Sequence, residues 1–156
     1  VLPFAPPGHP AHSAPRDCGL PRPARRHRYH PRAVARHPHS HPTLAVVTYP
    51  GLDVHPTKAN ADEFLGHGFG GVVVFGVKGG LDAGKTLIES VQLFSHLANV
   101  GDAKSLIIHP ATTTHSQLSD KELVRAGIGP DFVRISVGIE DVADIIADLD
   151  QALEAV

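Results

Sequence analysis

The sequence predicts a two-layer α/β domain over residues 43–156, with helices packed on a sheet. Three observations support this fold class. Short β-branched runs alternate with segments of helical periodicity along the chain. Turn pairs such as Pro50-Gly51 and Gly79-Gly80 separate these segments. The last segment, 140–155, carries an apolar stripe that suits a helix lying against a sheet.

Each element of this domain has its own signal in the sequence. Strands are predicted where β-prone apolar runs lie between turn residues, at 43–49, 72–77, 105–108 and 132–137. The run at 72–77 is continuous and β-branched, which is typical of a strand buried on both faces. Helices are predicted from apolar periodicity and capping residues, at 57–66, 82–97, 119–126 and 140–155. Ser119 and Glu122 form a capping-box pattern at the start of the third helix.

Residues 1–42 differ in composition from the rest of the chain. They hold ten of the fourteen prolines, seven of the twelve histidines, and seven arginines against one acid, Asp17. Their few large apolar side chains show no period, so they cannot bury enough surface to offset the entropy of ordering. We therefore expect disorder over 1–42. Because proline, arginine, histidine and alanine are what G/C-rich codons give in a wrong frame, we hypothesise a frameshift or misassigned start, with meaningful sequence resuming near Pro42.

Two binding functions stay open for this segment. Its histidines could bind a metal, although no cysteine or carboxylate accompanies them at zinc-site spacing. The clustered histidines are His27, His30, His37, His39 and His41. Its arginines could contact phosphates, but no aromatic spacing or binding fold accompanies them, and we expect no nucleic-acid partner. A non-catalytic, His-rich binding module is therefore one alternative function.

Cysteine content and hydropathy bear on where the protein works. The single cysteine, Cys18, excludes a disulfide within this chain and fits a reducing compartment. No apolar run approaches the roughly 20 residues of a membrane span. Prolines also interrupt any signal-peptide pattern after the first two residues. We therefore expect a cytoplasmic protein with no membrane partner.

A second alternative function comes from residues 79–86, which satisfy the phosphate-binding pattern G-x-x-x-x-G-K-[ST]. In a P-loop-like nucleotide-binding domain, the backbone amides of this loop would bind phosphates and Lys85 would reach the terminal phosphate. Asp82 argues against this site, because a carboxylate inside the loop would repel the anion. The strand 132–137 also runs into Gly138 rather than into an aspartate suited to hold magnesium. We therefore favour the interpretation that residues 79–86 form a loop that leads into a helix, with Lys85 exposed.

Two polar features stand out from the apolar elements. Hydroxyl and imidazole groups gather after Pro110, in the run 112–116. Such a run either satisfies its own backbone in a turn or forms a polar wall that faces a ligand. Arg134 is the arginine on the otherwise apolar strand 132–137.

Four ordered blocks carry a resemblance to a known family. They are Tyr49–Leu52 with His55-Pro56, GFGGVVVFGVKGG at 68–80, LFSHLANVGDAKSLIIHPATTTHSQL at 93–118, and VRISVGIEDVADIIADLDQAL at 133–153. Through them, residues from about 46 to 156 resemble the C-terminal domain of the Cys/Met-metabolism family of pyridoxal-phosphate enzymes. The resemblance is strongest to its O-acetylhomoserine sulfhydrylases (O-acetylhomoserine aminocarboxypropyltransferases). It also accounts for the P-loop-like pattern, because family members share the Gly-Gly turn into this helix.

The resemblance implies the substrate-side small domain of a fold-type I (aminotransferase-like) transferase. Such enzymes hold pyridoxal 5'-phosphate (PLP) on a lysine of a large N-terminal domain, and the cofactor serves as an electron sink. The implied reaction is γ-replacement of the acetate of O-acetylhomoserine by sulfide or a thiol, in methionine biosynthesis. The expected partner is a small amino-acid substrate, and full-length members are expected to be homo-oligomers, as tetramers. The sulfur donor stays open among sulfide, methanethiol and cysteine.

By the same resemblance, Arg134 matches the arginine that binds the substrate α-carboxylate, a task that suits its planar guanidinium. Asn99 matches a position beside that carboxylate, and Thr114 matches a threonine near the arginine. No catalytic or cofactor-binding residue is assigned, because the family's Ser-x-x-Lys context is absent from this chain. The lysines that lack it are Lys58, Lys78, Lys85, Lys104 and Lys121. We therefore expect this chain to be inactive on its own.

Overall fold

The fold is built on one sheet. The computed structural model describes residues 22–37 and 41–156. The strands are β1 (Leu44–Thr48), β2 (Val72–Val77), β3 (Ser95–His96), β4 (Leu106–Ile108) and β5 (Phe132–Ser136), in the spatial order β1-β2-β5-β4-β3. Neighbouring strands are antiparallel except for the parallel pair β3 and β4.

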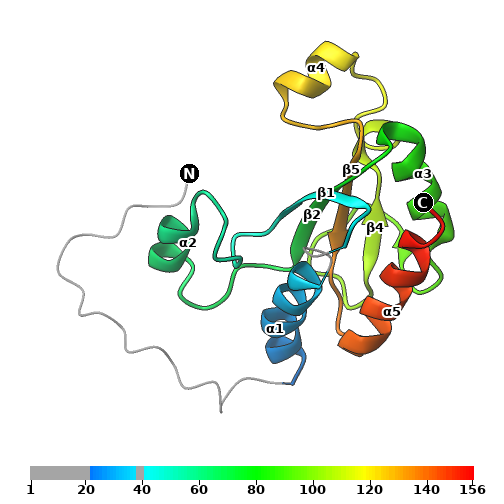
Figure 1. The fold of residues 1–156 in the computed structure, drawn as a ribbon. Helices are drawn as coiled ribbons and strands as arrows, with labels where there is room; N and C mark the ends of the chain where they lie inside the picture. The colour runs from blue at the N-terminus through cyan, green and yellow to red at the C-terminus, as the bar shows by residue number, and fades with distance from the viewer. Residues whose placement is uncertain (1–21, 38–40) are drawn as a thin grey trace.

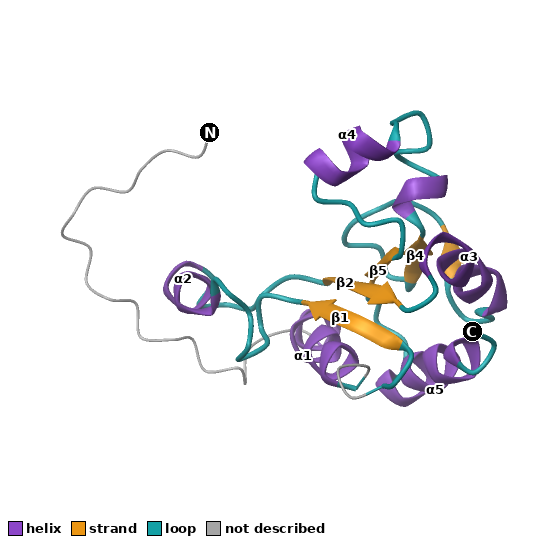
Figure 2. Cartoon of the chain, turned by 45° about the horizontal axis from the view of Figure 1, so that its top comes forward, coloured by secondary structure: helices purple, strands orange, loops and turns teal. Residues whose placement is uncertain are grey.

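Three helices form the second layer, on one face of the sheet (Figures 1 and 2). They are α1 (Arg22–Arg36), α3 (Gly80–Ser90) and α5 (Val142–Leu153). Two short helices, α2 (Lys58–Phe64) and α4 (Asp120–Arg125), stand apart from this layer, and a 3-10 turn, η3 (Pro110–Thr112), follows β4. The predicted two-layer arrangement is therefore confirmed. Among the described residues, no helix combines the length and apolarity needed to cross a bilayer.

The core lies between these helices and the sheet. Alternate side chains of the two central strands point into it and are at most 1% exposed: Val73, Phe75, Val77, Val133 and Ile135. Apolar side chains of α3 and α5 meet them from the helix layer. The prediction that 72–77 is buried on both faces is wrong. Val72 and Val74 are only partly buried, because they point to the face of the sheet without helices.

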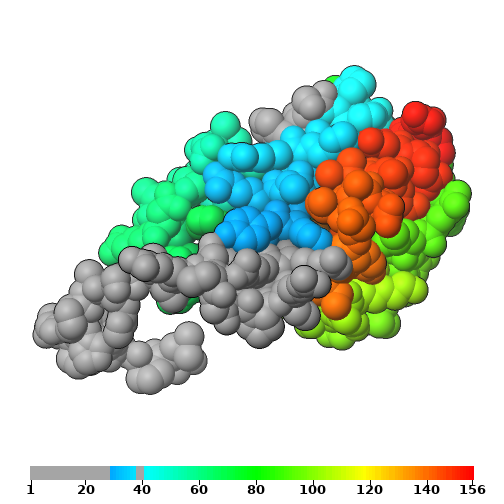
Figure 3. Space-filling view, turned by 90° about the horizontal axis from the view of Figure 1, so that it is seen from below, coloured from blue at the N-terminus to red at the C-terminus, as the bar shows by residue number. Residues whose placement is uncertain are grey.

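Helix α1 contradicts the expectation of disorder for residues 22–36, the part of the segment 1–42 that it occupies. Val34 and Ala35 are 0% exposed and belong to the core. Figure 3 shows α1 lying against α5. Low overall apolar content does not prevent this helix from forming, because a narrow apolar stripe is enough for a helix that docks on an existing core. Helix α1 therefore shares the core of residues 43–156, and residues 1–21 and 38–40 lie outside the described residues.

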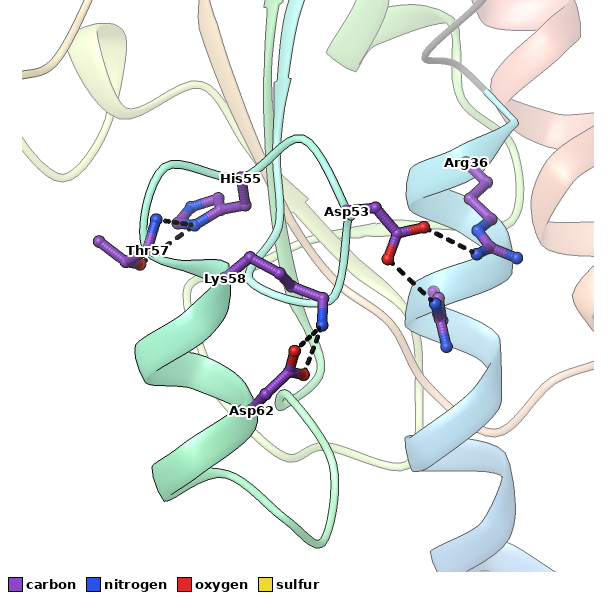
Figure 4. Close-up of polar contacts among 7 residues, drawn as sticks. Arg36, Asp53, His55, Thr57, Lys58 and Asp62 are labelled. Atoms are coloured by element: carbon purple, nitrogen blue, oxygen red, sulfur yellow. Dashed lines mark hydrogen bonds and ion pairs between the residues drawn. The ribbon is translucent and has the colours of Figure 1, made fainter.

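Ion pairs also join α1 to the segment that follows β1. Asp53 lies 3.6 Å from the guanidinium groups of both Arg32 and Arg36. Figure 4 shows this carboxylate against α1, with Lys58 pairing with Asp62 on α2 nearby. All three groups of the Asp53 cluster are well exposed, so each pair contributes at most about 1 kcal/mol. Apolar packing, more than these pairs, holds α1 in place.

Helix α3 is shorter than predicted. The apolar periodicity predicts a helix over 82–97, but α3 ends at Ser90 and Val91 is extended. The next three backbone N–H groups donate to the carboxylate of Asp148 instead of continuing the helix. The chain then forms β3, a strand that the sequence did not predict. By contrast, the capping box of Ser119 and Glu122 is confirmed at α4.

Tyr49 anchors the segment between β1 and β2, residues 49–71. Its side chain is 0% exposed, and its hydroxyl donates to the carbonyl oxygen of Gly70 at 3.2 Å. Its ring meets Phe69 edge to face, with centroids 6.4 Å apart. These contacts hold the start of this segment, at Tyr49, against its end, at Phe69 and Gly70. Burial raises the pKa of Tyr49 from 10.0 to about 12.

This buried phenol gives a pH-dependent stability. We expect the free energy of unfolding to fall as pH rises from about 10 to about 12, because the unfolded chain ionises Tyr49 first. The folded state then binds more protons than the unfolded state, so alkali favours unfolding. Urea titrations of the wild type and Tyr49→Phe across this window measure the effect. The Tyr49→Phe protein should lose stability less steeply, and equal slopes for the two proteins would contradict the expectation.

Candidate functional site

Arg134 lies on the face of the sheet that carries no helices. Its neighbours Val133 and Ile135 point into the core, so strand alternation places Arg134 on the opposite face. Its Nη2 atom donates to the backbone carbonyl of Asn99 at 3.1 Å. Among the described residues it has no acidic partner, although a guanidinium offers five N–H donors. The remaining donors suit a planar anion such as a carboxylate.

The loop that contains Asn99 is held by its own polar groups. The Asn99 side chain accepts from Val100 N at 2.8 Å and donates to Asp102 at 3.3 Å. The Lys104 backbone N–H, together with Asn99, holds the pKa of Asp102 below its ordinary value. The side chain of Asn99 is therefore engaged within the loop. The group that Asn99 presents to Arg134 is its backbone carbonyl.

The structure does not join Thr114 to Arg134 by a hydrogen bond. Thr114 Oγ1 lies 2.8 Å from His115 Nδ1 instead. Thr114 lines a small pocket of about 190 Å³ together with Ile108, which is the neighbour of Arg134 in the sheet. Thr114 is thus near the strand of Arg134, but the group that accepts a hydrogen bond from Arg134 is the backbone carbonyl of Asn99.

The other hydroxyls after Pro110 serve the loop itself. Thr113 Oγ1 donates to the carbonyl of His109 at 2.8 Å, and Thr112 Oγ1 lies 2.9 Å from His109 Nδ1. His109 is 0% exposed, and its Nε2 donates to the carbonyl of Pro130 at 2.8 Å. A Cβ on Gly84 would approach the same imidazole to 2.6 Å, so α3 packs directly on it. Thr112 and Thr113 therefore form hydrogen bonds within their own turn, as one of the two interpretations of this run predicted.

The structure contradicts the P-loop-like alternative, whereas His27 and His39 of the His-rich alternative lie outside the side chains that the structure describes. Helix α3 already begins at Gly80, so the residues of the P-loop-like pattern form helix rather than a phosphate loop. Thr86 Oγ1 donates to the carbonyl of Asp82 at 3.0 Å, within this helix. Within residues 22–37 and 41–156, no three histidine, cysteine or acidic side chains are grouped to hold a metal.

The lysines do not fit a covalent PLP site. Four of them, Lys78, Lys85, Lys104 and Lys121, are exposed. The fifth, Lys58, is committed to an ion pair with Asp62. A cofactor lysine must instead be sheltered and aimed at the reacting carbon. None of the five lysines is therefore placed as a cofactor lysine would be.

Two carboxylates with structural roles near this site were missed from the sequence. Glu140 accepts from Ser105 N at 2.7 Å and from Ser105 Oγ at 2.9 Å, which ties the start of β4 to the turn before α5. Asp148 lies on α5 and is buried. The signal that could have revealed it is an aspartate directly beside Leu149 on the apolar stripe of a helix.

The family model for Cys/Met metabolism PLP-dependent enzymes matches residues 22–154. The chain is 48% identical over 122 residues to the homocysteine synthase of Schizosaccharomyces pombe, covering 78% of this chain and 28% of that protein. It is 46% identical over 136 residues to the O-acetyl-L-homoserine sulfhydrylase of Leptospira meyeri, covering 86% of this chain and 31% of that protein.

A solved structure described as an O-acetylhomoserine (thiol)-lyase from Campylobacter jejuni is also similar. It superposes with a TM-score of 0.79 at 40% sequence identity, covering 85% of this chain and 31% of that chain. That structure carries N'-pyridoxyl-lysine-5'-monophosphate. The chain therefore spans 28% to 31% of the length of these relatives.

Proposed function

Because the chain belongs to the Cys/Met metabolism family of PLP-dependent enzymes, we propose that it forms the substrate-carboxylate side of an O-acetylhomoserine sulfhydrylase. Such an enzyme would replace the acetate of O-acetylhomoserine by sulfide or a thiol. Identity to a sulfhydrylase and a homocysteine synthase over most of the chain supports the proposal. The cofactor lysine would lie in the part of such an enzyme that this chain does not span.

One observation carries this proposal: the geometry of Arg134. Its guanidinium is oriented by the Asn99 carbonyl and has no acidic partner among the described residues. A substrate α-carboxylate would accept a bidentate, charge-assisted pair from the remaining N–H groups. Fixing the carboxylate would fix the orientation of the amino acid about its α-carbon. Thr114 would lie beside the bound substrate, through the pocket that it shares with Ile108.

A segment exchange tests the proposal. Residues 22–154, which the family model matches, would replace the corresponding segment of the Leptospira meyeri O-acetyl-L-homoserine sulfhydrylase, to which the chain is 46% identical over 136 residues. We expect the hybrid to form homocysteine from O-acetylhomoserine and sulfide, as measured by a thiol assay. A hybrid that folds and binds PLP but cannot turn over this substrate would contradict the proposal.

The chain on its own is expected to be inactive. We predict no stoichiometric, site-specific attachment of PLP to one lysine of the 156-residue chain after borohydride reduction, because its lysines are exposed or ion-paired rather than held in a cofactor site. The measurement is absorbance and intact mass after incubation with PLP and borohydride, with the hybrid enzyme as the positive control. Stoichiometric, site-specific attachment to one lysine of the isolated chain would overturn this prediction.

The cellular setting follows from the same proposal. A sulfhydrylase of methionine biosynthesis would act in the cytoplasm on a small amino-acid substrate. It would assemble as a homo-oligomer, which we expect to be a tetramer. Light scattering of the hybrid enzyme measures that oligomeric state.

A further inference from the structure

We infer that Asp148 is a positioning residue for the carboxylate site, because it sets the path that brings the Asn99 carbonyl to Arg134. Its role toward the substrate rests on the proposed function. The positional part of the inference rests on geometry alone. It concerns the turn at 91–94, between the end of α3 and β3.

The carboxylate of Asp148 receives three consecutive backbone N–H groups of this turn. Oδ1 accepts from Gln92 N at 2.8 Å, and Oδ2 accepts from Leu93 N at 2.9 Å and from Phe94 N at 3.3 Å. Asp148 is only 7% exposed, so its carboxylate is largely shielded from water when it accepts these charge-assisted bonds. Both oxygens are engaged, Oδ1 by one N–H group of the turn and Oδ2 by two.

Gln151 holds the other end of the same turn. It lies three residues after Asp148 on α5, which puts both side chains on one face of the helix. Its Nε2 donates to the carbonyl of Ser90, the last residue of α3, at 2.8 Å, and to Asp148 Oδ1 at 3.1 Å. Helix α5 thus grips the turn from Ser90 to Phe94.

These hydrogen bonds of Asp148 and Gln151 decide the direction in which the chain leaves α3 toward Asn99. The apolar periodicity of 82–97 favours a continued helix, which would carry Asn99 away from the sheet. With the N–H groups of the turn engaged by Asp148, the chain becomes extended and Ser95 N donates to Ser105 O at 3.1 Å. β3 then pairs with β4, and Asn99 arrives beside Arg134 three residues after β3 ends.

An asparagine at position 148 would break this arrangement at nearly constant volume. Its amide keeps one acceptor oxygen and turns an NH₂ group toward backbone donors. At least one N–H of the turn would then be buried without a partner. We expect the chain from 92 to 99 to become mobile and the Arg134–Asn99 hydrogen bond to weaken, while the core strands stay intact.

The first test uses the whole 156-residue chain. In Asp148→Asn, NMR should show faster amide exchange over 92–99 and loss of the protected Arg134 guanidinium signal, with β2 amides unchanged. Asp144→Asn, an exposed aspartate on the same helix, should change neither. If Asp148→Asn does not fold, Gln151→Ala should show the same changes to a smaller degree. Unaltered Arg134 and 92–99 signals in the folded variant would overturn the inference.

The second test uses the hybrid enzyme and compares kcat/KM for O-acetylhomoserine with kcat/KM for its carboxamide. Asp148→Asn should lower this acid-to-amide ratio about 2- to 30-fold. A merely structural role would lower both rates together and leave the ratio unchanged, which would overturn the role in substrate binding. If Arg134→Ala also leaves the ratio unchanged, the proposed function fails, while the NMR comparison still decides the positional coupling.

Discussion

Replacing Arg134 by alanine is expected to lower kcat/KM for O-acetylhomoserine by about two to four orders of magnitude in the hybrid enzyme. This corresponds to about 3–5 kcal/mol of transition-state binding. The loss arises because the substrate carboxylate would still be desolvated on binding, but no bidentate partner would offset that free-energy cost. The amino acid would also lose the anchor that fixes its orientation. Steady-state kinetics with saturating sulfide measure the effect.

Two further variants define the cause of that loss. Arg134→Lys keeps a positive charge but removes the planar fork, so it should recover only part of the activity. Arg125→Ala removes an exposed arginine from α4 and should leave kcat/KM within about twofold. Kinetics of Arg134→Ala that match those of Arg125→Ala would contradict the proposed role.

Leu149→Asp is expected to unfold the domain or to destabilise it by several kcal/mol. Leu149 is 1% exposed on α5 and packs in the core beneath the central strands. An aspartate there would bury a carboxylate among apolar side chains and leave a cavity as well. Thermal unfolding of the 156-residue chain, followed by circular dichroism, measures the change.

Ala147→Asp is the matched control on the same helix. Ala147 is exposed and lies two residues before Leu149, so it receives the same charge on the solvent side. Its melting temperature should stay close to that of the wild type. If Leu149→Asp melts at the temperature of Ala147→Asp, α5 does not pack on the sheet in solution.

Local sequence signals predicted most of the fold. The β-branched runs became β1, β2, β4 and β5, and the capped or amphipathic segments became α2, α4 and α5. The errors at α1 and at the end of α3 both involve α5. Helix α1 is stabilised by docking beside α5, and α3 is ended by a carboxylate that lies 54 to 56 residues later in the chain. Neither contact leaves a local pattern at the position that it changes.

The candidate site was predictable in its residue types but not in its connections. An arginine on an apolar strand was visible from the sequence, and the structure places it against Asn99. That the contact uses the backbone carbonyl of Asn99 follows only from the fold of the loop. Thr114 instead pairs with its neighbour His115, since the turn after Pro110 directs its hydroxyl there.

The central claim is that Arg134, held by the Asn99 carbonyl, binds the substrate carboxylate. The most direct test is the acid-to-amide ratio of kcat/KM in the hybrid enzyme, measured with and without the Arg134→Ala substitution. We predict that Arg134→Ala lowers the ratio at least about 100-fold, because only the acid can form the charge-assisted pair. An equal loss for acid and carboxamide, leaving the ratio unchanged, would contradict the claim.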